Sequence, residues 1–184
     1  MSDCEEMVDW YRQHCGSYFL KSEIKDRDNP KQAAFHGYQA LLALNGKWDL
    51  LRQRCEQILS AELKKDRKFL VDHRFYLALA DGDKSGMEAA LNELTSPKVA
   101  RIRNFAMAFG LTEHLIATHA TIYAKIAWRH GYEVEVDSPW VPKEWLPVQP
   151  LDCYEDPWPF MQEFDLWQPF EGDWAPWSPQ PSKK

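Results

Sequence analysis

The sequence predicts an all-α fold of stacked antiparallel helical hairpins around a central helix, followed by an extended C-terminal tail rich in proline and tryptophan. Apolar residues recur at helical spacing from about residue 29 to residue 130. Glycine-containing turns interrupt these runs, as expected where one helix ends and the next begins. Residues 133–184 hold ten of the twelve prolines, which excludes a long regular helix from this part of the chain.

The chain has 184 residues, of which 45% are hydrophobic and 27% charged, as is normal for one globular domain. We expect residues 1–150 to form a helical domain and residues 151–184 to form a tail that wraps it or binds a partner. The acidic N-terminus differs from the basic start of a signal peptide, and no apolar stretch has the length of a membrane span. The four cysteines are scattered. A cytoplasmic protein is therefore expected.

Two helix starts are expected at Asn29-Pro30 and Ser96-Pro97, where a capping residue precedes a proline whose missing N–H costs nothing. Between them, the segment that ends in Asn45-Gly46 resembles the segment that ends in Asp81-Gly82, 36 residues later. Amphipathic helices are expected to follow at residues 48–61 and 84–94. Two antiparallel hairpins at this period are typical of helical-repeat proteins, although two generic amphipathic pairs would produce the same pattern.

Residues 112–130 are the expected central helix, because two apolar stripes run along them. Residues 132–137 then alternate in period two, which predicts a short strand or an extended path over the helices. Residues 143–146 are expected to form a single turn that presses Trp145 onto the core.

The tail differs from the rest of the chain in charge. Residues 133–184 carry eleven acidic and three basic residues, a balance of −8, so the total of −6 leaves about +2 for residues 1–132. Six of the nine tryptophans also lie there, and large rings gain free energy on burial. We therefore expect this segment to lie along a surface. Residues 140–164 should pack largely on the chain's own helices, and residues from Trp167 onward should be available to a partner or disordered.

Two basic clusters could receive an acidic segment. The first is residues 64–68, and the second comprises Lys98, Arg101 and Arg103. We expect both to be solvated polar faces or docking sites for the tail, where each exposed ion pair contributes little.

The sequence contains no pattern that indicates catalysis or metal binding. His114 and His119 point about 140° apart on a helix, whereas metal-binding pairs use spacings of three or four residues. His119 is expected to be a hydrogen-bonded core histidine, and the adjacent His14 and Cys15 rarely meet as base and nucleophile. No phosphate-binding glycine loop or hydrolase motif occurs. We expect no enzyme activity, no cofactor and no metal, and the net acidic charge argues against nucleic-acid binding.

One segment resembles a known family. Residues 119–139, HATIYAKIAWRHGYEVEVDSP, followed by residues 141–146, VPKEWL, are similar to the C-terminal signature of immunity protein family 49. Its members are antidotes encoded beside bacterial polymorphic and contact-dependent toxins. The resemblance implies an all-α fold, no catalysis, and a function of binding and blocking one cognate toxin domain, often a nuclease. The tail beyond Leu146 does not match the family pattern.

The hypothesis from sequence is therefore a cytoplasmic immunity protein for bacterial competition, which binds a toxin domain and occludes it. The alternative is a tetratricopeptide-like adaptor that binds a peptide on a concave face. An acidic surface would match the basic groove of a nuclease-type toxin, and tryptophan is enriched at interface hot spots. The expected partner-binding residues are Asp152, Glu155, Asp156, Trp158, Glu163, Asp165, Trp167, Glu171, Asp173, Trp174 and Trp177. The sequence leaves the oligomeric state open.

Overall fold

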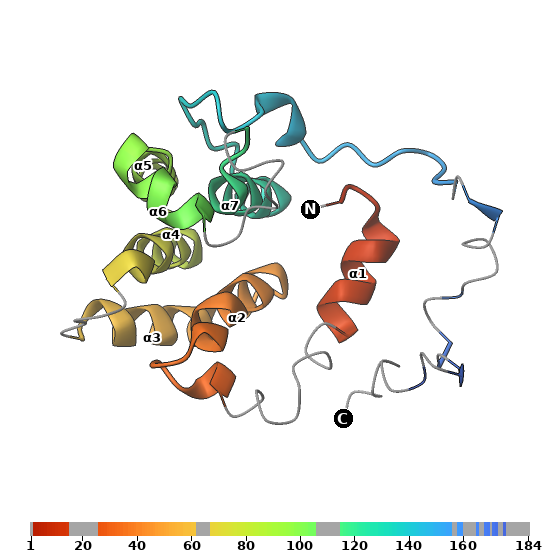
Figure 1. Cartoon of the computed structure of the whole chain (residues 1–184), viewed down its shortest axis with the longest axis horizontal. Helices are drawn as coiled ribbons and strands as arrows, with labels where there is room; N and C mark the ends of the chain where they lie inside the picture. The colour runs from red at the N-terminus through yellow and green to blue at the C-terminus, as the bar shows by residue number, and fades with distance from the viewer. Residues whose placement is uncertain are drawn as a thin grey trace. The chain divides into compact units, whose positions relative to one another are not determined.

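The computed structural model describes residues 2–14, 26–61, 67–105 and 115–155, together with residues 158, 159, 165, 168, 169, 171, 172 and 175. Within these residues the protein is all-helical, with seven α-helices and no strand (Figure 1). This confirms the predicted fold class. The chain divides into two compact units, one made of residues 26–148 and the other of residues 1–25 and 149–184.

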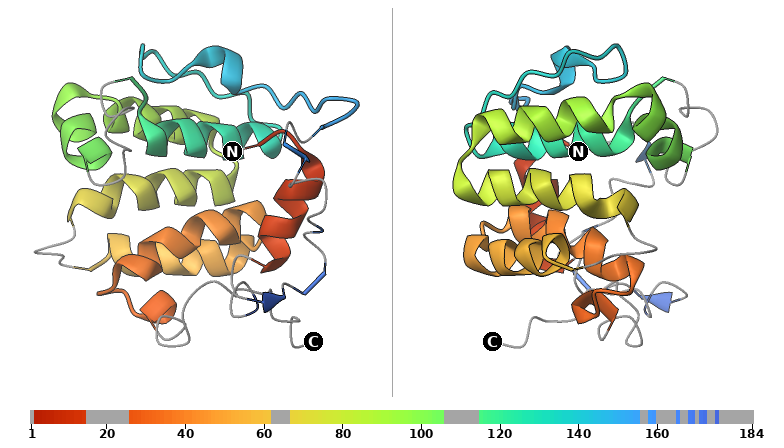
Figure 2. Two further views of the ribbon diagram at one scale, coloured as in Figure 1. Left: turned by 45° about the vertical axis from the view of Figure 1, so that its right-hand side comes forward. Right: turned by 90° about the vertical axis from the view of Figure 1, so that its left-hand side faces the viewer.

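The unit of residues 26–148 contains six of these α-helices. They are α2 (Ala33–Leu44), α3 (Trp48–Leu59), α4 (Leu70–Asp81), α5 (Lys84–Leu94), α6 (Pro97–Phe105) and α7 (Thr118–Arg129). Three 3-10 turns, η2 (Asp26–Asp28), η3 (Arg67–Phe69) and η4 (Lys143–Trp145), lie between or after them. Helix α4 contacts α2, α3 and α5, and α7 contacts α2, α5 and α6. Figure 2 shows α2 and α3 on one side of α4, with α5 and α7 on the other.

The two predicted helix-to-helix turns have the same local geometry. Gly46 and Gly82 both adopt positive φ, 62° and 71°, which an L side chain rarely does. In each turn the residue after the glycine donates its backbone N–H five residues back. Lys47 donates to Leu42 at 3.0 Å, and Asp83 donates to Ala78 at 2.8 Å. The two turns, 36 residues apart in the sequence, therefore share the same hydrogen-bond pattern. This pattern is that of a Schellman-type helix end.

Of the two helix starts expected at proline, one is confirmed and one is displaced. Helix α6 begins at Pro97, directly after Ser96. Helix α2 begins instead at Ala33, with Gln32 as its N-cap. The Asn29 side chain accepts a hydrogen bond from the Lys31 backbone N–H at 3.1 Å, so Asn29-Pro30 forms a turn ahead of the helix.

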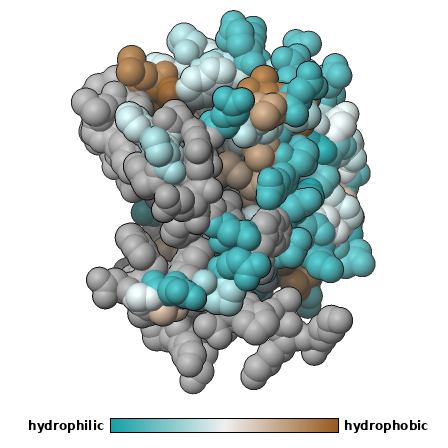
Figure 3. Space-filling model, turned by 90° about the vertical axis from the view of Figure 1, so that its right-hand side faces the viewer, coloured by the Kyte–Doolittle hydropathy of each residue, from teal (hydrophilic) through white to brown (hydrophobic). Residues whose placement is uncertain are grey.

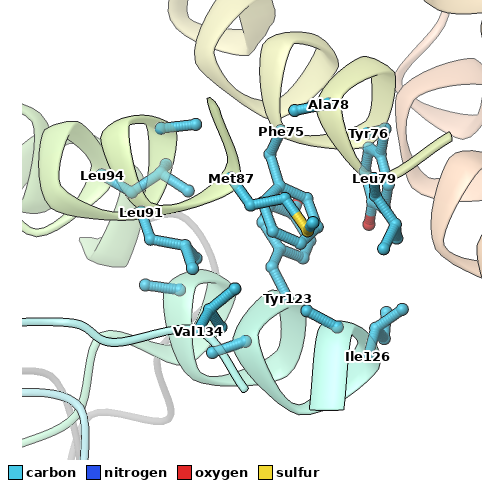
Figure 4. Close-up of a cluster of buried hydrophobic side chains, with 14 of the residues drawn as sticks. Phe75, Tyr76, Ala78, Leu79, Met87, Leu91, Leu94, Tyr123, Ile126 and Val134 are labelled. Atoms are coloured by element: carbon cyan, nitrogen blue, oxygen red, sulfur yellow. The ribbon is translucent and has the colours of Figure 1, made fainter. Parts of the chain in front are cut away.

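The core of this unit lies between α4, α5 and α7 (Figure 4). Phe75 and Tyr76 of α4 meet Tyr123 of α7, and the Phe75 and Tyr123 rings stack with centroids 5.1 Å apart. Met87 of α5 is fully buried in the same cluster. Burial of each such side chain stabilises the fold by about 1.5–3 kcal/mol. This packing explains why α4 is buried along most of its length.

Helix α7 is shorter than expected, because the chain from Leu115 to Ala117 is not helical. Residues 112–114 lie outside the described part of the chain. After α7, residues 132–138 form no helix or strand, with Val134 and Val136 buried and Glu133, Glu135 and Asp137 exposed. The alternation therefore marks an extended path over the helices, one of the two predicted outcomes.

Side chains of α5 accept hydrogen bonds from the backbone of this segment, as the backbone of a neighbouring strand would in a sheet. The Glu135 backbone N–H donates to Glu88 Oε1 at 3.0 Å, and the Asp137 N–H donates to Asn92 Oδ1 at 3.4 Å. Residues two apart on an extended chain and four apart on a helix both repeat at roughly 6–7 Å. The two acceptors on α5 therefore match the two donors in spacing.

The second unit contains α1 (Glu5–His14). Cys4 and Val8 are its buried apolar residues among those described. Arg12 pairs with Asp9 one helical turn earlier, at 3.1 Å. The described residues of this unit from residue 149 onward form no continuous α-helix.

Candidate functional site

The predicted partner-binding residues of the tail are exposed wherever the structure describes them. Asp152, Glu155, Trp158, Asp165 and Glu171 are all exposed, and Trp158 is 59% exposed. The other predicted residues lie outside the described part of the chain: Asp156, Glu163, Trp167, Asp173, Trp174 and Trp177. In the space-filling view, hydrophilic side chains cover most of the coloured surface, and hydrophobic ones occur in small groups (Figure 3).

The expectation that residues 140–164 pack on the chain's own helices is wrong for part of this stretch. Trp140 is half-buried and packs against the core. Every residue from 149 to 155 is exposed, as are Trp158 and Pro159.

The single turn expected at residues 143–146 is present as η4. It buries Leu146 and not Trp145, the residue expected to face the core. Leu146 points into the core, and Trp145 is 56% exposed. A 3-10 turn places successive side chains about 120° apart, so only one of these two neighbours can face the helices. The prediction that Trp145 packs on the core is therefore wrong.

The second predicted basic cluster does not form one exposed face. Lys98 and Arg101 are exposed, but Arg103 is 4% exposed and pairs with Asp72 of α4. Arg103 is therefore not a docking site for the acidic tail. Of the first cluster, only Arg67 and Lys68 are described, and both are exposed.

A buried polar cluster joins three helices. The Arg103 guanidinium of α6 donates to Asp72 Oδ1 at 2.7 Å, and the Tyr123 hydroxyl of α7 donates to the same oxygen at 2.6 Å. All three side chains are buried, so the cluster connects α4, α6 and α7 and does not face solvent. Sequence reasoning missed it, because Asp72 and its partners are 31 and 51 residues apart.

Burial dominates the electrostatics of this cluster. It raises the pKa of Asp72, and the Arg103 charge and the hydrogen bonds from Tyr123 and Arg103 only partly oppose that effect. The pKa of Tyr123 is raised well above its ordinary value, first by burial and then by the neighbouring Asp72 carboxylate. His119 lies beside Tyr123 with its Nδ1 atom unbonded. Its pKa is lowered to about 4, mainly by burial and then by the Arg103 charge.

Two histidines form a second buried pair that sequence reasoning also missed. His36 Nδ1 of α2 and His73 Nε2 of α4 lie 2.8 Å apart, so one ring nitrogen donates and the other accepts. The His36 ring also stacks on Phe69, with centroids 4.1 Å apart. The pKa of His73 is lowered to about 3, first by burial and then by the charges of His36 and Arg54. The His73 ring is therefore neutral near pH 7.

These buried groups do not form a metal site. Among the described residues, no group of three or more histidine, cysteine, aspartate or glutamate side chains could hold an ion. Cys15 of the adjacent His14-Cys15 pair lies outside the described residues. No helix in the described ranges is both long enough and apolar enough to cross a membrane.

The structure thus defines an all-α protein, with acidic and aromatic side chains exposed among the described residues of its C-terminal segments. A family model described as Immunity protein 49 matches residues 25–145. Because this match covers more than half of the 184 residues, the chain belongs to the immunity protein 49 family. Neither the curated proteins nor the solved structures compared with it give a match. Membership indicates a non-enzymatic role with a toxin as partner.

Proposed function

We propose that this protein is an immunity protein that binds one cognate bacterial toxin domain and neutralises it by occlusion. The observation that carries this proposal is the family match over residues 25–145, which includes every helix of the larger unit. The toxin is proposed to be a nuclease-type effector, because such enzymes bind nucleic acid through basic surfaces. An acidic partner would fill a site that is meant for phosphate.

The exposed tail supplies the first candidate contacts. Residues 133–184 have a balance of −8, and the carboxylates of Asp152 and Glu155 are exposed there. Charges at the rim of an interface mainly accelerate association, whereas a tryptophan such as Trp158 slows dissociation when it is buried by the partner. The six tail residues outside the described ranges belong to the same proposal.

The test is a binding titration with the purified toxin domain encoded beside this gene, inactivated by mutation so that it can be produced. Full-length protein should bind at a 1:1 ratio and should protect cells that express the active toxin. Substitution of Asp152→Asn with Glu155→Gln should slow association about tenfold at low salt. Substitution of Asp49→Asn with Glu56→Gln on α3 changes the charge equally and should leave association unchanged. Absence of both binding and protection would contradict the proposed function.

The alternative is a helical-repeat adaptor, and one observation favours it. The turns at Gly46 and Gly82 repeat the same hydrogen bonds at an interval of 36 residues. An adaptor would bind a short peptide more weakly and would not protect cells from a toxin. The protection assay therefore separates the two functions.

A further inference from the structure

The turn η4 holds an exposed tryptophan on a well-anchored support. The Trp145 backbone N–H donates to the Pro142 carbonyl at 3.1 Å, which closes the turn. The next residue, Leu146, is 3% exposed and fixes the turn to the core. Directly after it, the Pro147 carbonyl accepts a hydrogen bond from the buried Lys125 ammonium of α7 at 2.6 Å. The backbone on both sides of the Trp145 ring is therefore held in place.

Trp145 differs from the other tryptophans of the same unit. Trp48, Trp128 and Trp140 are partly buried and pack against the core. The Trp128 indole N–H also donates to the Val134 carbonyl at 3.2 Å. Trp145 is 56% exposed, so most of its ring is left for a partner to cover. A large aromatic ring on a fixed backbone loses little conformational freedom on binding, which favours a role as an interface anchor.

The charges on the segment that leads to this ring indicate which partner fits it. Among residues 133–145, the exposed charged side chains are Glu133, Glu135, Asp137, Lys143 and Glu144, a balance of −3. Among the residues that the structure describes, these four carboxylates form no ion pair. Glu135 and Asp137 donate their backbone N–H groups to α5, which fixes the extended segment that carries them. Figure 2 shows this segment and η4 on the same side of α5 and α7.

We propose that Trp145 is the apolar anchor of a docking surface for a basic face of the toxin domain, with the flanking carboxylates providing charge complementarity. This inference rests on the proposed function and adds a surface on the unit of residues 26–148 to the contacts of the tail. Opposite charges accelerate the encounter, and burial of the indole ring slows dissociation. The surface lies mainly within the part of the chain that matches the family model.

The experiment uses the full-length protein and the inactivated toxin domain encoded beside its gene. Trp145→Ala should raise Kd at least about tenfold, mostly through faster dissociation, and Trp145→Phe should recover part of the loss. The matched control is Leu50→Ala on α3, where the side chain is 44% exposed and is not part of the proposed surface. It should leave Kd within about twofold. Melting curves of all variants should stay close to that of wild type, because both side chains are about half exposed and lie at the surface.

A charge-reversal pair tests the nature of the partner's surface. Glu135→Lys with Asp137→Lys should slow association at least about tenfold at low salt and flatten its salt dependence. Asp49→Lys with Glu56→Lys on α3 should do neither. If wild type binds and protects while the Trp145 and charge variants behave like their controls, this docking surface is overturned and the proposed function stands. If wild type neither binds nor protects, both are overturned.

Discussion

The Tyr123 hydroxyl and the Arg103 guanidinium share one oxygen of the buried Asp72 carboxylate, at 2.6 and 2.7 Å. Three helices that are far apart in the sequence are thus joined at a single atom. Helix α6 contributes Arg103, α7 contributes Tyr123, and α4 contributes the carboxylate. The loss of the carboxylate would leave a buried guanidinium without its counter-ion, which is far more costly than the loss of an exposed pair.

Asp72→Asn should lower the free energy of unfolding by about 3 kcal/mol, because Arg103 would remain buried and unpaired. Tyr123→Phe should cost about 1 kcal/mol, the usual value for one hydrogen bond. The control is the exposed Arg74–Glu93 pair, which has the same N–O distance of 2.7 Å. Glu93→Gln should cost less than about 1 kcal/mol. Urea unfolding at pH 7 measures all three, and equal losses for Asp72→Asn and Glu93→Gln would contradict the role of burial.

His73 should make stability depend on pH. Its pKa is lowered from 6.5 to about 3 in the folded protein, so between these values the unfolded chain binds a proton that the folded chain does not. The contribution of His73 to the free energy of unfolding is therefore fully present above pH 6.5. It is lost as the pH falls, by about 2 kcal/mol at pH 5. The raised pKa of Asp72 acts in the opposite direction, so the slope should be compared between wild type and His73→Asn. Unfolding between pH 5 and 7.5 should give a smaller slope in the variant. Equal slopes would show that His73 is not the group responsible.

Gly82 should not tolerate a side chain. Its φ is 71°, and an added Cβ would lie 2.9 Å from the Tyr132 hydroxyl oxygen. Gly82→Ala should therefore lower the free energy of unfolding by about 1–2 kcal/mol. Gly37 within α2 is the control, because its Cβ would meet nothing within 4 Å. Gly37→Ala should stabilise the protein by about 0.5–1 kcal/mol, since alanine favours a helix interior. Thermal unfolding of the two variants should shift in opposite directions.

Amide hydrogen exchange can test how α5 holds the extended segment. Glu88→Ala removes the acceptor of the Glu135 N–H and should speed exchange at that amide. Exchange at Asp137, whose acceptor is Asn92, should change less. Glu88→Gln keeps a side-chain oxygen at the same position and should preserve protection of Glu135. Protection that survives Glu88→Ala would mean that packing of Val134 and Val136, rather than this hydrogen bond, shields the amide.

Local signals predicted much of the fold. The turns at Asn45-Gly46 and Asp81-Gly82 form as expected, because only glycine reaches positive φ without strain. The amphipathic helices after them also begin where expected, at Trp48 and Lys84. Asn29-Pro30 forms a turn and not the expected helix start, since the asparagine side chain caps a turn just as readily as a helix.

The candidate sites were harder to predict. The exposure of Asp152, Glu155 and Trp158 agrees with a surface role, whereas the exposure of Trp145 was not foreseen. A turn that contains both Trp145 and Leu146 can bury either side chain, and local sequence does not decide between them. The choice depends on how the turn packs against the rest of the core, which Leu146 joins.

The sequence by itself determined the all-α class, the two hairpin turns, the alternating extended segment and the family of this protein. Each of these depends on residues within a few positions of one another, where backbone geometry and side-chain period act directly. Only the tertiary structure decided that Arg103 is buried, that His36 pairs with His73, and that Trp145 faces solvent. Those outcomes depend on distant helices coming together, because burial and pairing are set by whichever groups share the same space.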